Sequence, residues 1–267
     1  MNTLRFDSSA LSIEFQPVDW DSDVIGNTVM QVEKLEVRQA DDALSKMEDL
    51  LNDLSEQGVA LATCRIPHYS IQESMILEGA GFKFIEMVLH PFMDKLTNKE
   101  FRADENIIIE IAQLHELEEI SRISEVAFIN DRFSIDYRIP PKASASRYKN
   151  WVLSCENHPS QKVVKFSKNK EVVGFFIIEE DTCSRKAYWH LTAISPQHHG
   201  QGLGAKCWQS MLADHKSRNI TEVLTTISAR NTPVLNLYSK LNFRFKNPEM
   251  TFHWVNEKLL SSNNLLS

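Results

Sequence analysis

A glycine-rich turn between an apolar strand and an amphipathic helix is the segment of this sequence with the clearest capacity for chemistry. Gly200, Gly202 and Gly204 alternate along it, and Cys207 and Met211 follow at helical spacing. Glycine lets a backbone approach a ligand closely, and the unpaired N–H groups of a first helical turn converge on negative charge. The sequence therefore predicts an anion-binding turn that needs no basic side chain.

Other glycine motifs fit this turn less well. A Walker loop requires a lysine directly after its last glycine, and here Gly204 is followed by Ala205. A dinucleotide fingerprint has the spacing G-x-G-x-x-G, whereas this turn has G-x-G-x-G. Three alternating glycines taken alone are also compatible with a tight turn that binds nothing, so the flanking pattern decides between these interpretations.

The flanking pattern resembles the Gcn5-related N-acetyltransferase (GNAT) superfamily over residues 107–256. The cofactor turn of that family runs apolar-x-Pro-x-x-Arg/Gln-Gly-x-Gly-apolar-Gly/Ala, and a strand, Asn231, Tyr238 and Phe243 follow here in the family order. The resemblance implies an α/β (α+β) fold of GNAT type, in which helices flank a central, mixed and mostly antiparallel sheet. It also implies acetyl-CoA as the acyl donor and no metal.

By this resemblance the cofactor contacts come from the strand end, the turn and the head of a later helix: Thr192, Ala193, Ile194, His199, Gly200, Gln201, Gly202, Leu203, Gly204 and Asn231. Two positions depart from the family pattern. His199 stands where arginine or glutamine is usual, and Asn242 replaces the glycine before the final phenylalanine. We expect both to be tolerated, because the first acts mainly through its backbone N–H and asparagine readily adopts a left-handed conformation.

Acetyl transfer to an amine needs a proton donor for the departing thiolate and an acceptor for the amine proton. The resemblance assigns Tyr238 as the general acid, and the alternative is a tyrosine that only packs its ring. Glu86 is the first candidate for the base, because it stands on an otherwise apolar strand, although it could simply face water. His190 is an alternative proton relay, but a single histidine on a strand is more often structural.

For the acceptor, the layout is most similar to the dTDP-fucosamine acetyltransferases, which acetylate the 4-amine of a dTDP-linked 4-amino-4,6-dideoxygalactose. That likeness implies substrate contacts from Arg132, Phe133 and Tyr148. Residues 131–149 hold five basic residues against two acids, which suits a diphosphate. A polyamine, an amino acid or a protein N-terminus as acceptor, and a non-catalytic acyl-CoA-binding module, remain alternatives.

The elements that must position these residues follow from hydrophobic periodicity. We expect a helix between Asp41 and Gly58, a polar helix that ends at 79–81, a helix over 115–128 and another opening at 148–153, with 131–145 irregular. The expected strands are 28–37, 59–64, 82–90, 107–111, 163–166, 172–178 and 187–194. Charged residues over 94–106 indicate a linker, which predicts a small N-terminal α/β domain at 1–100 and an acetyltransferase domain at 107–257.

An internal sequence similarity relates the two predicted domains. Gly81-Phe82-Lys83-Phe84 resembles Asn242-Phe243-Arg244-Phe245, and each follows a helix that itself follows an apolar strand. The N-terminal part therefore resembles a partial copy of the second. It lacks the glycine-rich turn, and Leu77 stands where Tyr238 stands in the second copy, so we assign it no cofactor chemistry.

The composition and charge of the sequence disfavour several classes of partner. The formal net charge of −7 disfavours broad affinity for nucleic acid or for anionic membranes. Four cysteines without a C-x-x-C pair argue against a zinc site and a disulfide scaffold. No secretory signal or long apolar segment is present in the sequence, so we expect a cytoplasmic protein that acts on a small-molecule amine, with a homodimer as one option for its assembly.

Overall fold

The computed structural model describes residues 3–263 of the chain. The strands are β1 (Leu4–Asp7), β2 (Leu11–Pro17), β3 (Thr28–Val37), β4 (Val59–Pro67), β5 (Lys83–Met93), β6 (Ile108–Ile111), β7 (Gln161–Lys168), β8 (Glu171–Asp181), β9 (Lys186–Ile194), β10 (Glu222–Thr225), β11 (Ile227–Ser228) and β12 (Arg244–Val255). The helices are α1 (Asp19–Ile25), α2 (Ala40–Glu56), α3 (Ile71–Gly79), α4 (Leu117–Ala127), α5 (Arg132–Ile135), α6 (Pro141–Ser154), α7 (Leu203–Ser217), α8 (Thr232–Lys240) and α9 (Glu257–Asn263). Short 3₁₀ helices lie at η1 (Leu96–Asn98), η2 (Leu114–Glu116) and η3 (Pro196–His198).

The described residues form two compact units. Unit 1 takes its residues from the stretch up to Val88, from Asp131–Arg147 and from Asn247 onward, and unit 2 contains Leu89–Asn130 and Tyr148–Lys246. The two domains predicted from the sequence, 1–100 and 107–257, are each one continuous stretch of chain. That they fold independently stays a prediction. The two compact units, in contrast, are made of separate stretches of chain, and β5 and β12 each begin in one unit and end in the other.

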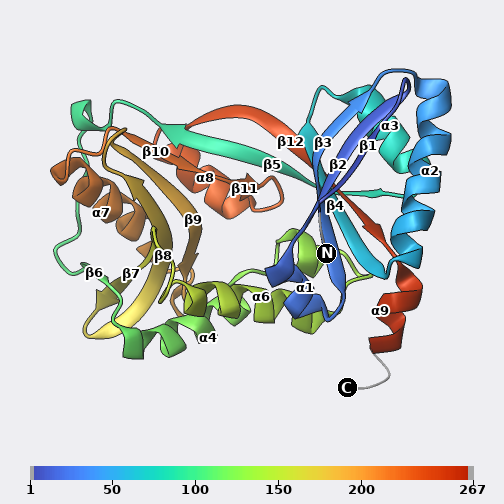
Figure 1. Ribbon diagram of the computed structural model, residues 1–267. Coiled ribbons are helices and arrows are strands. Elements are labelled where there is room, and N and C mark those ends of the chain that lie inside the picture. Colours follow the sequence, from blue (N-terminus) through green and yellow to red (C-terminus); the bar gives the residue numbers. More distant parts are fainter. Residues whose placement is uncertain (1–2, 264–267) are drawn as a thin grey trace. The chain divides into compact units, whose positions relative to one another are not determined.

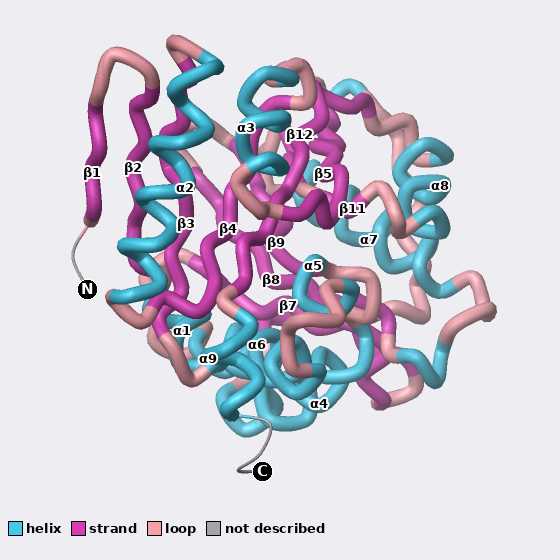
Figure 2. Tube along the Cα trace, turned by 90° about the vertical axis from the view of Figure 1, so that its right-hand side faces the viewer, coloured by secondary structure: helices cyan, strands magenta, loops and turns pink. Residues whose placement is uncertain are grey.

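Unit 1 is built on strands in the order β1-β2-β3-β4-β12. The pair β3–β4 is parallel, whereas β1–β2, β2–β3 and β4–β12 are antiparallel. The helix α2 carries apolar residues at helical spacing, so Ala43, Met47 and Leu51 are buried against one face of these strands. Figure 2 shows the cyan α2 helix running beside the magenta strand β2, and α2 also contacts β4.

Unit 2 is built on strands in the order β5-β10-β9-β8-β7-β6. The pair β9–β10 is parallel, and β5–β10, β8–β9, β7–β8 and β6–β7 are antiparallel. The helices α7 and α8 cover one face through Leu203, Met211 and Tyr238 (Figure 1), and α4 with the end of α6 covers the other through Ile120 and Val152. Both units therefore combine mixed, mostly antiparallel strands with helices, as the sequence predicted.

The two similar sequence segments form helix ends of the same geometry. The backbone N–H of Phe82 donates to the carbonyl of Leu77 (2.9 Å), and that of Phe243 donates to the carbonyl of Tyr238 (3.0 Å). The residue before each phenylalanine is left-handed, with φ of 100° at Gly81 and 61° at Asn242, so the asparagine adopts the expected conformation. Leu77 thus occupies the position of Tyr238 in the N-terminal copy.

The strands that follow these two helix ends are exchanged between the copies. The end of β5 pairs with β10, where Phe92 lies opposite Leu224. The end of β12 pairs with β4, where His253 lies opposite Thr63. Each unit therefore contains a strand whose preceding helix belongs to the other copy, which explains why the units do not follow chain order.

Among residues 3–263, no helix is both long and apolar enough to span a membrane. The four cysteines are free thiols, and burial raises the pKa of Cys64 to about 12, of Cys207 to about 12 and of Cys155 to about 11. These three buried thiols are therefore protonated at neutral pH and unreactive as nucleophiles.

Candidate functional site

The edge of β9 opens where β10 leaves it. The parallel pairing runs from Lys186 opposite Glu222 to Trp189 opposite Thr225 and then ends, while β9 continues to Ile194 along β8. The Thr225 hydroxyl donates to the carbonyl of Trp189 (2.8 Å) and closes the last paired position. Beyond it, within the described residues, the backbone of β9 has no strand on its β10 side, so its free N–H and C=O groups can bind an extended ligand.

The glycine-rich turn follows directly on this open edge. Gly200 and Gly202 have left-handed φ values of 76° and 72°, which glycine adopts without steric cost. A Cβ atom at either position would meet no other atom within 4 Å. Gly202 is also the N-cap of α7 and offers no capping side chain, so the first N–H groups of α7 point into open space, where they can bind an anion.

The side chains of the turn play different parts. The His199 ring lies with Nε2 2.9 Å from the carbonyl of Ile194 and ties the turn to the end of β9. The Gln201 amide donates to the carbonyl of Gln197 (3.3 Å). Leu203 is buried in the core beneath α7, so only its backbone can reach a ligand. These contacts hold the turn in shape. The His199 N–H donates to the carbonyl of Pro196 (3.2 Å), so among the described residues the N–H groups of 200–204 are the ones left for a ligand.

Asn231 begins α8 as its N-cap. Its side-chain oxygen accepts a long hydrogen bond from the backbone N–H of Val234 (3.4 Å), which fixes the orientation of the side chain. Because the oxygen is used by the helix, the amide NH₂ group is the part of Asn231 that can donate to a ligand.

Tyr238 is fully buried on α8, with its ring against Phe243 (4.8 Å between centroids). Its hydroxyl has no hydrogen-bond partner among the described residues, although the side chains of Trp208, Thr225 and Thr192 lie near it. Burial raises the pKa of Tyr238 above its ordinary value, so the phenol keeps its proton at neutral pH. An unpaired buried donor costs free energy, and a bound acceptor atom would remove that cost.

The residues predicted to contact the acceptor fall into both units. Glu86 on β5 is 6% exposed, Arg132 has a side chain that is 15% exposed, and Phe133 is fully buried in unit 1. Phe133 lies under the Arg132 guanidinium, 5.0 Å from ring centroid to Cζ, and so supports that group. Tyr148 belongs to unit 2, where it stacks on Phe128 at 4.4 Å within a hydrophobic cluster.

Asp21 lies at the centre of the buried charged residues of unit 1, a role that was not predicted from the sequence. This carboxylate is 1% exposed and lies 2.8 Å from Nε of Arg147 and 3.5 Å from Nη2 of Arg132. The Arg147 guanidinium also lies over the rings of Trp20 (4.1 Å) and Phe133 (4.9 Å). No motif marks Asp21, because its partners come from α5 and α6, more than a hundred residues away.

Arg132 is short of partners within this group. Its only hydrogen bond among the described residues is the 3.5 Å contact with Asp21. Burial, together with the positive charge of Arg147, lowers the pKa of Arg132 to about 10. A guanidinium has five N–H donors, so most of its capacity is unused, and an anionic group would fit it.

Gly174 on β8 is a further residue that the sequence analysis missed. A Cβ atom there would lie 2.6 Å from the carbonyl of Ala193 and 2.8 Å from the Ile194 side chain. We therefore expect Gly174→Ala to push the end of β9 away and to lower the free energy of unfolding by about 1–3 kcal/mol. The control Gly79→Ala meets only the flexible end of Leu44 at 3.0 Å, and an equal loss of stability from both changes would contradict the prediction.

His253 makes unit 1 sensitive to acid. It is fully buried, its Nδ1 lies 3.0 Å from Asp136, and burial lowers its pKa from about 6.5 to about 4. Between those two values the unfolded chain binds more protons than the folded one, so the free energy of unfolding falls as the pH drops from 6.5 to 4. We expect a loss of about 3 kcal/mol from this residue.

Urea unfolding at pH 7.5, 6, 5 and 4 measures this dependence. The comparison is with His253→Gln, whose stability should change less across the same window, although Asp136 then loses one of its partners. Parallel pH profiles for the two proteins would show that His253 is not the group that titrates.

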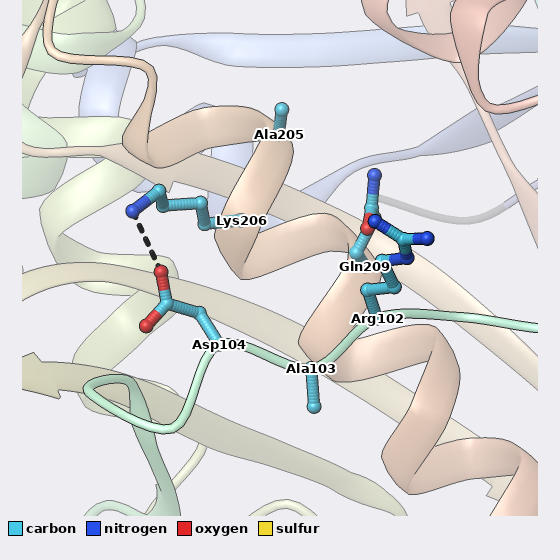
Figure 3. Close-up of a pocket in the computed structure, with 6 residues that line it drawn as sticks. All are labelled: Arg102, Ala103, Asp104, Ala205, Lys206 and Gln209. Carbon is cyan, nitrogen blue, oxygen red and sulfur yellow. Dashed lines mark ion pairs between the residues drawn. The ribbon is translucent and has the colours of Figure 1, made fainter.

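A pocket of about 340 Å³ lies beside α7, between Ala205, Lys206 and Gln209 on the helix and residues 102–104. In Figure 3, the Lys206 ammonium points to the carboxylate of Asp104, and the two lie 2.7 Å apart. This ion pair and the N–H groups of Asn106 lower the pKa of Asp104 to about 2. Because the lysine is already neutralised, we assign no ligand to this pocket.

A model of the acetyltransferase (GNAT) family matches residues 118–243. No curated protein sequence matches the chain. A GCN5-related N-acetyltransferase from Sphaerobacter thermophilus is similar in structure, with 14% identity, 94% of this chain and 82% of that chain covered, and a TM-score of 0.63.

Two further solved structures have the same architecture. A GCN5-related N-acetyltransferase from Kribbella flavida has 10% identity, covers 94% of this chain and 89% of its own, and gives a TM-score of 0.59. A tandem GNAT protein from the clavulanic acid biosynthesis pathway has 12% identity, with 92% and 79% covered and a TM-score of 0.58. These likenesses show the fold, and they confirm the predicted GNAT architecture with a second, partial copy in the N-terminal part.

Proposed function

We propose, on the premise that residues 118–243 belong to the acetyltransferase (GNAT) family, that this protein transfers an acetyl group from acetyl-CoA to a primary amine. The observation that carries the proposal is the uncapped start of α7, where two left-handed glycines border open space. It lies directly after the open edge of β9. An extended molecule with a diphosphate at one end matches this sequence of backbone groups.

The residues of unit 2 fit acetyl-CoA part by part. The N–H groups of 200–204 would bind its diphosphate, and the open edge of β9 at Thr192, Ala193 and Ile194 would bind its pantetheine arm, with the Asn231 amide as a further donor. When bound, acetyl-CoA supplies an acetyl group activated as a thioester. An N–H on the open edge of β9 would polarise the carbonyl of that group.

Tyr238 would supply the proton for the leaving sulfur. Its hydroxyl keeps its proton at neutral pH because burial raises its pKa. In the part of the chain that the structure describes, no hydrogen-bond partner competes for that proton. On the acceptor side, Glu86, Arg132, Phe133 and Tyr148 stay predictions. Glu86 is one candidate for the group that takes the amine proton, and the others would contact the acceptor.

For the acceptor we propose the 4-amine of a dTDP-4-amino-4,6-dideoxyhexose. The under-used guanidinium of Arg132 supports an anionic acceptor, since arginine binds phosphate oxygens in pairs. Tyr137, which lies on the same segment of unit 1 and is 93% exposed, offers a ring on which a base could stack.

A thiol-release assay with this nucleotide sugar, spermidine and glycine tests the assignment, and turnover of spermidine or glycine alone would refute it.

Thermal unfolding with and without acetyl-CoA tests the cofactor. We expect acetyl-CoA to raise Tm and ATP at the same concentration to have little effect. Gly202→Ala should lose this rise, and Gly58→Ala is a matched control, because Gly58 also has a left-handed φ (80°) and no atom near its Cβ position. Both changes should cost about 1–2 kcal/mol of stability. An absent rise in the unaltered protein would refute every function based on acetyl-CoA.

A further inference from the structure

His190 occupies a β-bulge at the point where the edge of β9 opens. On β8, Ile177 lies opposite Leu191 and Ile178 lies opposite Trp189, so His190 is the extra residue between two paired positions. The parallel pairing with β10 ends at Trp189, one residue earlier. Bulges bend a strand and re-aim a side chain, and they are frequent beside active sites. His190 therefore departs from the regular alternation of side chains along β9, at the residue where the unpaired edge of β9 begins.

The imidazole of His190 is held on one side only. Its Nε2 lies 3.0 Å from Oε2 of Glu179, and its ring lies against Tyr188 (4.6 Å) and Trp151 (6.2 Å). Nδ1 has no partner among the described residues, and the side chain is 20% exposed. A carboxylate that accepts from one ring nitrogen leaves the lone pair on the other, so Nδ1 is the atom that can accept a proton.

The charges around His190 favour a neutral ring that can become charged. Burial lowers the pKa of His190, and His158, from the loop after α6, lowers it further. Glu179 on β8 opposes both and would stabilise the protonated ring. The hydrogen bond from His190 in turn lowers the pKa of Glu179, which keeps that carboxylate ionised. Tyr188 on β9 is the other titratable neighbour, and Trp151 on α6 carries no charge.

We propose that His190, oriented by Glu179, takes the proton of the acceptor amine through Nδ1. The inference rests on the proposed function, and it assigns to unit 2 the role that the sequence analysis gave first to Glu86. An imidazole is better matched to proton transfer near pH 7 than an ordinary carboxylate, because a catalytic base works best when its pKa lies near the working pH. Glu179 acts as a positioning residue.

The protons balance as follows. The ammonium of the acceptor loses one proton to Nδ1 of His190, and the freed lone pair forms the new N–C bond as the C–S bond breaks. The nitrogen then loses a second proton, and the sulfur gains one from the hydroxyl of Tyr238. His190 releases its proton to solvent and Tyr238 is reprotonated by the second amine proton. The sum is one amide, one thiol and one released proton.

The pH dependence of turnover tests this role with dTDP-4-amino-4,6-dideoxygalactose as acceptor, or with spermidine if that amine alone is turned over. His190→Gln should lower kcat/KM for the amine about 10²-fold at pH 7 without changing the acetyl-CoA-dependent rise in Tm. The defect should shrink as the pH rises toward the pKa of the amine, because a growing fraction of the amine is then neutral without a base. A purely structural role would give a loss that does not depend on pH.

Two variants complete the comparison. His115→Gln alters an exposed histidine outside the site and should behave as the unaltered protein. Glu86→Gln should keep the acidic limb of the pH profile. If Glu86→Gln removes that limb and His190→Gln preserves it, the inference is overturned and Glu86 is the proton acceptor.

A readout without ligands separates this inference from the proposed function. In ¹⁵N NMR spectra of the free protein at pH 7, His190 should be neutral with its proton on Nε2, and Glu179→Gln should lower its pKa further. A charged ring, or a proton on Nδ1, would overturn the inference even if acetyl-CoA binds. Failure of acetyl-CoA to raise Tm would instead overturn the proposed function, whatever the state of His190.

Discussion

Tyr238→Phe is expected to lower kcat by roughly 10²- to 10⁴-fold while leaving the free energy of unfolding unchanged or slightly higher. The two effects separate because the hydroxyl is buried and has no hydrogen-bond partner among residues 3–263. Removing an unpaired polar atom from a core relieves a desolvation cost, and the ring that packs against Phe243 stays in place. A structural tyrosine with a satisfied hydroxyl would show the opposite balance, with lost stability and little lost turnover.

Single-turnover thiol release and urea unfolding measure the two quantities on the same preparation. Tyr69→Phe is the control, because Tyr69 is exposed in unit 1 and should affect neither. The acetyl-CoA-dependent rise in Tm should persist in Tyr238→Phe, which shows that the donor still binds. Near-normal turnover in this variant would exclude Tyr238 as the general acid.

Asp21→Asn is expected to give the largest loss of stability, about 3–5 kcal/mol. The substitution keeps the shape of the side chain but removes the carboxylate charge that lies against Arg147 and Arg132. Breaking a buried ion pair from one side removes the carboxylate that stabilises a buried positive charge, and here the change acts on two guanidinium groups. The loss should be visible as a lower urea midpoint without a change in the slope of the transition.

Asp19→Asn is the matched control, because Asp19 lies on the same helix and is exposed. Its effect should stay within about 0.5 kcal/mol. Combining Asp21→Asn with Arg132→Met should cost less than the sum of the single changes, because the double variant buries one charge fewer. An Asp21→Asn variant as stable as Asp19→Asn would contradict the ion-pair interpretation.

The periodicity of the sequence predicted most of the elements around the site. The predicted strand 28–37 coincides with β3, the strand 187–194 with β9, and the helix 115–128 with α4. These elements have one buried face, so the spacing of their apolar residues records their conformation. The turn residues at 200–204 and the cap at Asn231 are local in the same sense, because their geometry depends on contiguous residues.

The prediction that residues 131–145 are irregular was wrong. The structure has α5 at Arg132–Ile135 and α6 from Pro141. The first is a single turn, too short to show a periodic pattern, and it is begun by Asp131, whose carboxylate accepts from the N–H of Phe133 (2.8 Å). The second has weak amphipathicity because its serines and charged residues are spread around its axis. The spacing of apolar residues therefore could not predict either helix.

The sequence by itself determined the candidate donor site of this protein: a glycine-rich turn, a capped helix and Tyr238 at a fixed spacing after Asn231. The tertiary structure alone decided which distant charges meet. Asp21 meets Arg147 across 126 positions of sequence, and His190 meets Glu179 through the register of two strands and a bulge. The reason is physical: backbone geometry is set by neighbouring residues, whereas a buried charge is stable only beside the partners that packing brings to it.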